Sequence, residues 1–180
     1  MSDAKVAARL RQLIVSDYLH LYGGRAETSA EQILKGVRRF GIDPSLHAVV
    51  MMRLVCRGPR ALAPVLIWML QTKHGIVMTR ECELGAGLII PHPLSIVLGP
   101  ETRIGANVRI YHNVSLGAPA WGGVRLGDGA VVHCNSTVAP GVSIGKGALI
   151  GANCTVTADV PDGGVFVRGV LRSPTFSERQ

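Results

Sequence analysis

The chain has 180 residues, a length typical of a single domain, and only 4% of them are aromatic. Its formal net charge is +7, but lysine and arginine are not clustered with interleaved aromatics, which argues against a nucleic-acid-binding surface. Such an excess of positive charge suits a small polyanionic ligand or an acidic membrane surface.

The N-terminus reads MSDAKVAARLRQ, which is too polar and charged for a secretory signal. The most apolar run, residues 61–70, is too short to span a bilayer. We therefore expect a cytoplasmic protein with no integral membrane segment.

Residues 1–75 predict an α-helical region. Four helices are expected, each bounded by glycine, proline or a capping residue: 4–22 before Gly23-Gly24, a second opened by Thr28 or Ser29, a third between Asp43-Pro44-Ser45 and Gly58-Pro59, and a fourth over 61–72. We expect this region to cap an open end of the strands that follow. His20, His47 and His74 fall in it or at its junction, where we assign them structural roles.

From residue 76 onward, an aliphatic residue returns every six positions, with a small or apolar residue at the fifth position of each hexad. The leads are Leu84, Ile90, Leu98, Ile104, Ile110, Leu116, Leu126, Val132, Val138, Ile144, Ile150 and Val156. This period fits neither a 3.6-residue helix nor the alternating strands of an ordinary β-sandwich. It is typical of a parallel β-helix with triangular coils, whose lead and fifth residues point inward.

The four cysteines predict no disulfide framework, and the absence of a CxxC pair or other metal-ligand spacing predicts no metal site. Cys82 and Cys154 occupy fifth positions and are expected in the core, while Cys56 falls in an expected helix. Only Cys134 takes an outward position.

Two histidines fall into register with the repeat. One coil is three hexads, and Ile96-Val97 inserts two residues, so one coil from Ile90 ends at Ile110. His92 and His112 are the third residues of these hexads and should stack about 5 Å apart, and Cys134 and Ala152 should continue the column. A placed imidazole can take a proton from a hydroxyl, although a surface histidine is the plainer reading.

A break in the repeat falls at residues 117–125, which read GAPAWGGVR. A loop projecting from a solenoid commonly supplies binding contacts. Trp121 could cover a ligand or a neighbouring subunit there, or be an incidental side chain of a solvated loop.

Residues 76–172 resemble the hexapeptide-repeat acyltransferases, and within them the serine O-acetyltransferase group. The resemblance rests on IPHPLSIVLG (90–99), IGANVRIYHNVSLG (104–117), IGKGALIGANCTVTAD (144–159) and DVPDGG (159–164). The segment SDYLHLYGG (16–24) and residues 44–54 are similar to short relatives from bacterial polysaccharide gene clusters. The resemblance implies a left-handed parallel β-helix over 76–172, an N-terminal α-helical cap over 1–75 and a C-terminal tail over 173–180.

The family's catalytic histidine corresponds to His92, which implies that His92 is the general base, with His112 assisting it or binding the acceptor. The resemblance also implies a homotrimer that holds acetyl-CoA, or another acyl-CoA, between two β-helices. Gly117, Ala118, Ala152 and Arg172 are the implied cofactor contacts. Trp121 and Cys134 are our candidates for contacts with the acceptor.

The sequence departs from the family where a serine acceptor would bind. The aspartate that orients the catalytic histidine corresponds to Val77, and the aspartate that precedes the histidine corresponds to Pro91. The family's Arg-His pair falls in the loop, which offers Gly122-Gly123. A zwitterion needs paired charges in its site, because unpaired burial is costly.

These observations predict an acyl-CoA-dependent O-acyltransferase that acts on a small hydroxyl-bearing acceptor other than free L-serine. Two alternatives stay open. One is a serine O-acetyltransferase of cysteine biosynthesis, and the other is a non-catalytic trimeric scaffold subunit, which the loss of the aspartate at Val77 favours.

Overall fold

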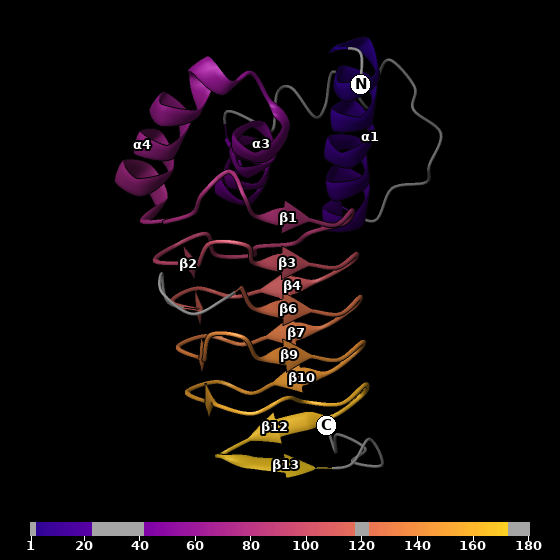
Figure 1. Cartoon of the computed structure of the whole chain (residues 1–180), viewed down its shortest axis with the longest axis vertical. Coiled ribbons are helices and arrows are strands. Elements are labelled where there is room, and N and C mark those ends of the chain that lie inside the picture. Colours follow the sequence, from indigo (N-terminus) through magenta and orange to yellow (C-terminus); the bar gives the residue numbers. More distant parts are fainter. Residues whose placement is uncertain (1–2, 23–41, 118–122, 173–180) are drawn as a thin grey trace.

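The structure is a computed structural model that describes residues 3–22, 42–117 and 123–172. Helices α1 (Asp3–Tyr22), α3 (Pro44–Arg57) and α4 (Ala63–His74), with a 3-10 turn at Arg60–Leu62, precede a stack of short strands. They match the first, third and fourth helices predicted from the sequence, and the second lies outside the described residues. Figure 1 shows the helices at one end of the stack and β13 at the other.

Local chemistry explains where the cap helices begin and end. The Asp43 carboxylate caps α3 by accepting hydrogen bonds from the backbone amides of Ser45 and Leu46, at 2.8 and 3.3 Å, and Pro44 takes the first helical position. Helix α4 ends at Gly75, whose positive φ of 62° lets its amide bond back to the carbonyls of Gln71 and Leu70. Both ends face the first coil.

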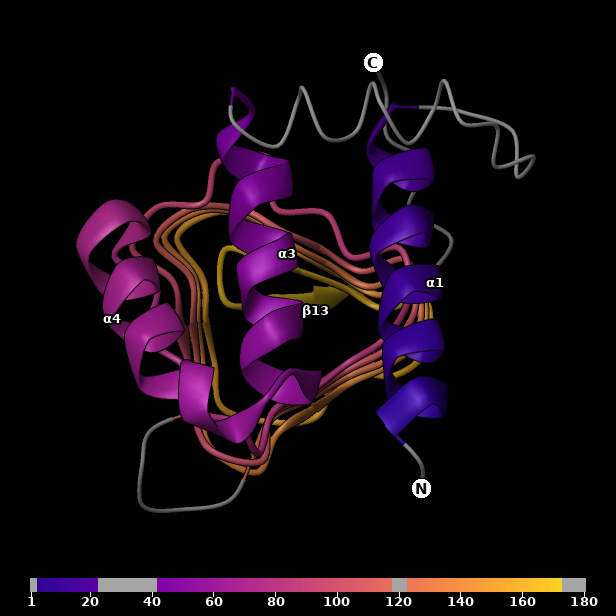
Figure 2. The ribbon, with the colours of Figure 1, turned by 90° about the horizontal axis from the view of Figure 1, so that it is seen from above.

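The strands form three sheets, one on each side of a triangular coil (Figure 2). The first contains β1 (Glu83–Leu84), β3 (Arg103–Ile104), β6 (Arg125–Leu126) and β9 (Ser143–Ile144); the second contains β4 (Arg109–Ile110), β7 (Val131–Val132), β10 (Leu149–Ile150), β12 (Val165–Val167) and β13 (Val170–Arg172); the third contains β2 (Val97–Leu98), β5 (Ser115–Leu116), β8 (Thr137–Val138) and β11 (Thr155–Val156). All pairs are parallel except β12 with β13. This is the predicted left-handed β-helix with an N-terminal helical cap.

The core follows the hexad pattern. The lead residues are buried, as are the fifth-position residues, including Cys82 and Cys154, which are 3% and 2% exposed. Two inward polar residues are paired: the Thr102 hydroxyl donates to the Gly99 carbonyl at 2.7 Å, and the Ser136 hydroxyl donates to the Gly151 carbonyl at 2.8 Å. Burial raises the pKa of the Cys82 thiol, which is consistent with its predicted role as a small core residue.

Small or amide side chains occupy the corners because neighbouring coils approach closely there. A Cβ on Gly85 would stand 2.3 Å from the Gly105 carbonyl carbon of the next coil, so no larger residue fits. At another corner Asn113, Asn135 and Asn153 adopt left-handed backbone conformations. Their side chains form a ladder, with bonds of 2.9 Å between Asn113 and Asn135 and 3.1 Å between Asn135 and Asn153.

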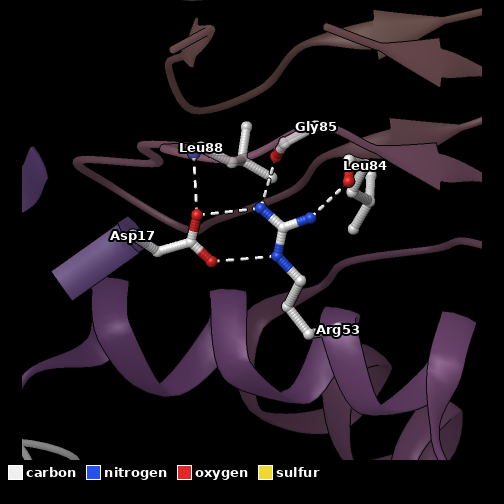
Figure 3. Close-up of polar contacts among 5 residues, drawn as sticks. All are labelled: Asp17, Arg53, Leu84, Gly85 and Leu88. Carbon is white, nitrogen blue, oxygen red and sulfur yellow. Dashed lines mark hydrogen bonds and ion pairs between the residues drawn. The ribbon is translucent and has the colours of Figure 1, made fainter. Parts of the chain in front are cut away.

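A buried ion pair fixes the helices on the first coil (Figure 3). The Arg53 guanidinium of α3 binds both carboxylate oxygens of Asp17 in α1, at 2.8 and 2.9 Å, and donates to the carbonyls of Leu84 and Gly85 in the coil. Asp17 also accepts a hydrogen bond from the Leu88 amide at 2.9 Å. Burial raises the pKa of Asp17, and the guanidinium and the amide oppose that shift. The pair therefore ties two helices and one coil into a single unit.

The far end of the β-helix closes differently. Strand β13 folds back antiparallel on β12 through Arg168 and Gly169, both at positive φ. Two central residues at positive φ are the signature of a tight two-residue hairpin turn. This reversal ends the parallel coils.

Candidate active site

His92 and His112 stack on adjacent coils, as the repeat predicts. Ile89 pairs with Arg109, which sets the register of one coil, and the two imidazole centroids lie 5.8 Å apart with the rings edge to face at 70°. His92 is exposed, whereas His112 is partly buried. The Nδ1 atom of His112 is buried and has no hydrogen-bond partner among the described residues, so a ligand atom there would recover a missing interaction.

The column continues through Cys134 and Ala152. The amide of Asn135 bonds to the His112 carbonyl at 3.2 Å, and the amide of Asn153 bonds to the Cys134 carbonyl at 3.0 Å. The asparagine ladder therefore runs beside the column and fixes its spacing. Cys134 is partly buried and Ala152 is exposed.

A second pair of rings lies beside this column. Tyr111 and His133 follow the hexad leads Ile110 and Val132, and their rings stack with centroids 4.8 Å apart and planes 12° from parallel. His133 therefore has an aromatic neighbour. This stacking could have been predicted from the sequence. Tyr111 directly precedes His112 and His133 directly precedes Cys134, so the two residues occupy the same position on successive coils.

A cavity of about 660 Å³ opens between the helical cap and the segment that carries His92. Its lining includes His47 at the start of α3, Lys73 and His74 at the end of α4, and Pro91, His92 and Leu94 of the coil. His47 and His74, to which the sequence assigned structural roles, thus share a cavity with His92. His47 and His74 are separated by 27 positions in the sequence, so sequence reasoning could not place them side by side.

His47 and His74 are hydrogen-bonded to each other, with 2.9 Å between Nδ1 of His47 and Nε2 of His74. Burial lowers the pKa of His47, and the nearby Lys73 ammonium adds to the effect. Burial also lowers the pKa of His74; His47 and Lys73 act in the same direction, and the Pro93 carbonyl opposes them. Both shifts favour the neutral pair.

His74 also holds the segment that carries His92. The Ser95 amide donates to the His74 carbonyl at 2.9 Å, and the Leu94 amide donates to the His92 carbonyl at 2.8 Å. Because Pro93 has no N–H, its contact with the His74 ring must use its carbonyl. The end of α4 therefore positions the backbone that follows His92.

Among the described residues, the other positions singled out in the sequence do not line the cavity that contains His92. Val77 pairs with Val97 and is 42% exposed, so no carboxylate stands at that position. Gly117 directly follows β5 and has a positive φ of 74°. Arg172 lies in β13, at the end opposite the helices (Figure 1). Ala118 and Trp121 lie outside the described residues.

Within the described ranges, no group of three or more histidine, cysteine, aspartate or glutamate side chains is arranged to hold a metal ion. Nor is any helix in those ranges both long and apolar enough to cross a bilayer.

The repeat is matched by two family models. The bacterial transferase hexapeptide (six repeats) matches residues 123–158, and the hexapeptide repeat of succinyl-transferase matches residues 95–139. A serine acetyltransferase of Helicobacter pylori is 35% identical over 78 residues, which are 41% of this chain and 46% of that protein. The chain thus spans about half the length of the curated relatives it matches.

Solved structures of serine acetyltransferases share the fold of this chain. Serine acetyltransferase of Neisseria gonorrhoeae superimposes with a TM-score of 0.75 at 24% identity, over 95% of this chain and 67% of that one. A serine acetyltransferase in complex with CoA gives a TM-score of 0.70 at 18% identity, over 88% of this chain and 66% of that one. The chain therefore carries the hexapeptide repeat of the bacterial transferases, is similar in sequence to serine acetyltransferases over that repeat, and shares its left-handed β-helical fold with them.

Proposed function

We propose that this protein is an acyl-CoA-dependent O-acyltransferase, with acetyl-CoA as the expected donor and His92 as the general base. The observation that carries the proposal is the position of His92. It stands on a rigid coil, contacts the partly buried His112, and lines a cavity large enough for a small acceptor.

In this reaction the acceptor hydroxyl gives its proton to the His92 imidazole while its oxygen attacks the thioester carbonyl carbon. The tetrahedral adduct then collapses, the carbon–sulfur bond breaks, and the imidazolium returns the proton to the departing CoA thiolate. The products are an O-acyl ester and free CoA. His112, with its unpaired buried Nδ1, is placed to bind the acceptor or steady the His92 ring.

The described residues are compatible with an acyl-CoA beside this column. Small residues at Gly117 and Ala152 leave room for close backbone approach, and a neighbour of the same fold was solved in complex with CoA. Ala118 and Arg172 complete the proposed cofactor contacts. We further propose that the protein is a homotrimer, in which the cofactor lies between two β-helices and Trp121 and Cys134 contact the acceptor or its surroundings.

We also propose that the acceptor is not free L-serine. Among the described residues that line the cavity, Asp43 is the one carboxylate, and its oxygens already accept bonds from two α3 amides and from the Tyr22 hydroxyl. The ammonium of serine would therefore lack a free carboxylate. The serine acetyltransferase relatives favour the opposite reading, in which serine is the acceptor. The third reading is a non-catalytic scaffold, which is favoured by the loss of the family's aspartate at the position of Val77.

Two measurements separate these readings. Calorimetry with acetyl-CoA tests donor binding, and release of the CoA thiol in the presence of hydroxyl compounds, with L-serine among them, tests transfer. We expect the protein to bind acetyl-CoA and to release the CoA thiol when an acceptor other than serine is present. Rapid release with serine would establish the alternative enzyme, and absence of donor binding would leave the scaffold.

A further inference from the structure

The cavity between the cap and the first coil is lined by charged groups of both signs, and the acidic one is already engaged. Lys73, His47 and His74 bring nitrogen groups to its wall, and the Lys73 ammonium is close enough to influence both histidines. The Asp43 carboxylate on the same wall is occupied by the α3 cap and by Tyr22. Since both histidines are neutral, the Lys73 ammonium is the cationic group that the described wall offers to an entering anion.

A second, independent feature of the wall points to a ligand. Ser45 lines the cavity, is 5% exposed, and its hydroxyl has no hydrogen-bond partner among the described residues. A buried hydroxyl without a partner is destabilising, because it has lost its hydrogen bonds to water. An oxygen acceptor in the cavity would supply that partner, and an anionic oxygen would supply it best.

The same cavity includes His92, while Pro91, Pro93 and Leu94 make the rest of its coil side apolar. An acceptor bound there can keep its charged end against the cap and its hydroxyl against His92. The cap segment and the coil segment are held together by the hydrogen bond from the Ser95 amide to the His74 carbonyl, so the separation of the two ends is fixed.

We propose that this cavity binds an acidic group, a carboxylate or phosphate, on the acceptor, and that Lys73, Ser45 and the His47–His74 pair recognise it. This inference rests on the proposed acyltransferase function and narrows its acceptor to an anionic hydroxyl compound. The same site is poorly suited to the ammonium of an amino acid, because the one carboxylate among the described lining residues, Asp43, is already engaged.

Binding can be tested without turnover. Inorganic phosphate is titrated into the full-length protein while the imidazole resonances are followed by nuclear magnetic resonance. The signals of His47 and His74 should shift, whereas His20, on the exposed side of α1, should not. Lys73→Gln and Ser45→Ala should each raise the dissociation constant for phosphate about tenfold. This is the loss of affinity expected when one hydrogen bond to a charged group is removed.

Lys146→Gln is the matched control, because Lys146 is an exposed lysine on a distant coil, 3.9 Å from Asp128. It should leave phosphate binding unchanged. Equal weakening in Lys146→Gln and Lys73→Gln would show that only general surface charge is sensed, and would overturn the proposal.

The activity measurement uses small hydroxyl compounds that share a three-carbon chain and differ in whether they carry an acidic group. Thiol release from acetyl-CoA is compared for glycerol, glycerate and glycerol 3-phosphate, which also separates a carboxylate preference from a phosphate preference. We expect an acidic compound to be favoured, and Lys73→Gln to raise its Michaelis constant about tenfold with a smaller effect on kcat.

Different results would contradict the acidic subsite and the acyltransferase function. If glycerol reacts as well as its acidic analogues and phosphate leaves His47 and His74 unshifted, the acidic subsite is wrong while transfer that depends on His92 stands. If phosphate shifts both histidines but none of the acceptors releases thiol, the anion site stands and the acyltransferase assignment must be reconsidered.

Discussion

His92 has neighbours from two separate parts of the molecule. His112 contacts it from the next coil, and the end of α4 holds its backbone through the hydrogen bond between Ser95 and His74. The aspartate expected from the family resemblance is replaced by Val77, whose side chain has no hydrogen-bonding group. The orientation of the His92 ring therefore depends on packing and on the proline-flanked segment rather than on a carboxylate.

Replacing His92 tests the proposed base. His92→Ala should lower turnover at least about a hundredfold, because a placed general base typically contributes about 100- to 10,000-fold. Acetyl-CoA affinity and the circular dichroism spectrum should not change. His112→Ala should lose less turnover, or should mainly raise the Michaelis constant of the acceptor.

His20→Gln is the matched control, since His20 is an exposed histidine of α1. Near-wild-type turnover of His92→Ala together with inactive His112→Ala would mean that the two roles are exchanged. Full activity of both variants would place the reaction elsewhere in the molecule.

Arg53 is the residue on which attachment of the cap depends most. Arg53→Met should lower the free energy of unfolding by about 3–5 kcal/mol, because it leaves the buried Asp17 carboxylate without its counter-charge. Arg103→Met is the comparison, since the Arg103–Glu83 pair is exposed at 57% and 60% and should contribute only about 0–1 kcal/mol. Urea unfolding of both variants measures the difference, and similar losses would contradict this account of the pair.

At the scale of elements, the ends of α3 and α4 form the side of the cavity opposite the coil. Their histidines are neutral because burial lowers both pKa values below the ordinary value of about 6.5. The unfolded chain therefore binds more protons than the folded chain as the pH falls through that value. The cap should consequently be least stable on the acidic side.

We expect the free energy of unfolding to decrease as the pH falls from about 7.5 to about 5.5. The double variant His47→Gln/His74→Gln should show a shallower decrease, because the two groups that titrate differently in the folded and unfolded states are gone. Denaturant titrations at several pH values provide the measurement. His20→Gln should keep the wild-type slope, and an unchanged slope in the double variant would rule out this pair as its source.

The break in the repeat is the second element with a predicted role. Most of its residues lie outside the described ranges, but Gly117 and Gly123 fix its two ends. A Cβ on Gly123 would stand 2.1 Å from the Glu101 carbonyl oxygen, so the chain re-enters the coil closely packed. Trp121 is the large side chain between these anchors.

Trp121→Ala, or shortening of the loop, should weaken binding of acetyl-CoA or of the acceptor without unfolding the protein. The physical reason is loss of a large apolar contact surface at the proposed cleft. Calorimetry with acetyl-CoA and Michaelis constants for the acceptor check this, alongside thermal unfolding. Unchanged values in both variants would remove the loop from the site.

At the scale of the whole molecule, the β-helix presents three sides of short strands, with helices at one end and a hairpin at the other (Figures 1 and 2). Such sides can pack around a three-fold axis, which closes the assembly. We expect a homotrimer by multi-angle light scattering at micromolar concentration. A monomer would contradict the trimer and, with it, the placement of the cofactor between two β-helices.

The hexad pattern by itself determined the β-helix, because a six-residue period matches one side of a triangular coil and no other regular structure. It also placed His92 and His112 in one column, since a fixed number of residues per coil converts sequence separation into vertical alignment. Asp43, Pro44 and Gly75 similarly mark helix ends through local hydrogen bonding, which depends on few neighbours.

Only the tertiary structure brought His47, Lys73 and His74 to the cavity that His92 lines. The cap has no repeat, so no period relates its residues to the coil. Their approach depends on how α3 and α4 pack on the first coil and on the buried Arg53–Asp17 pair that holds them there. Such long-range packing is set by the summed shape of many side chains, and sequence spacing alone does not encode it.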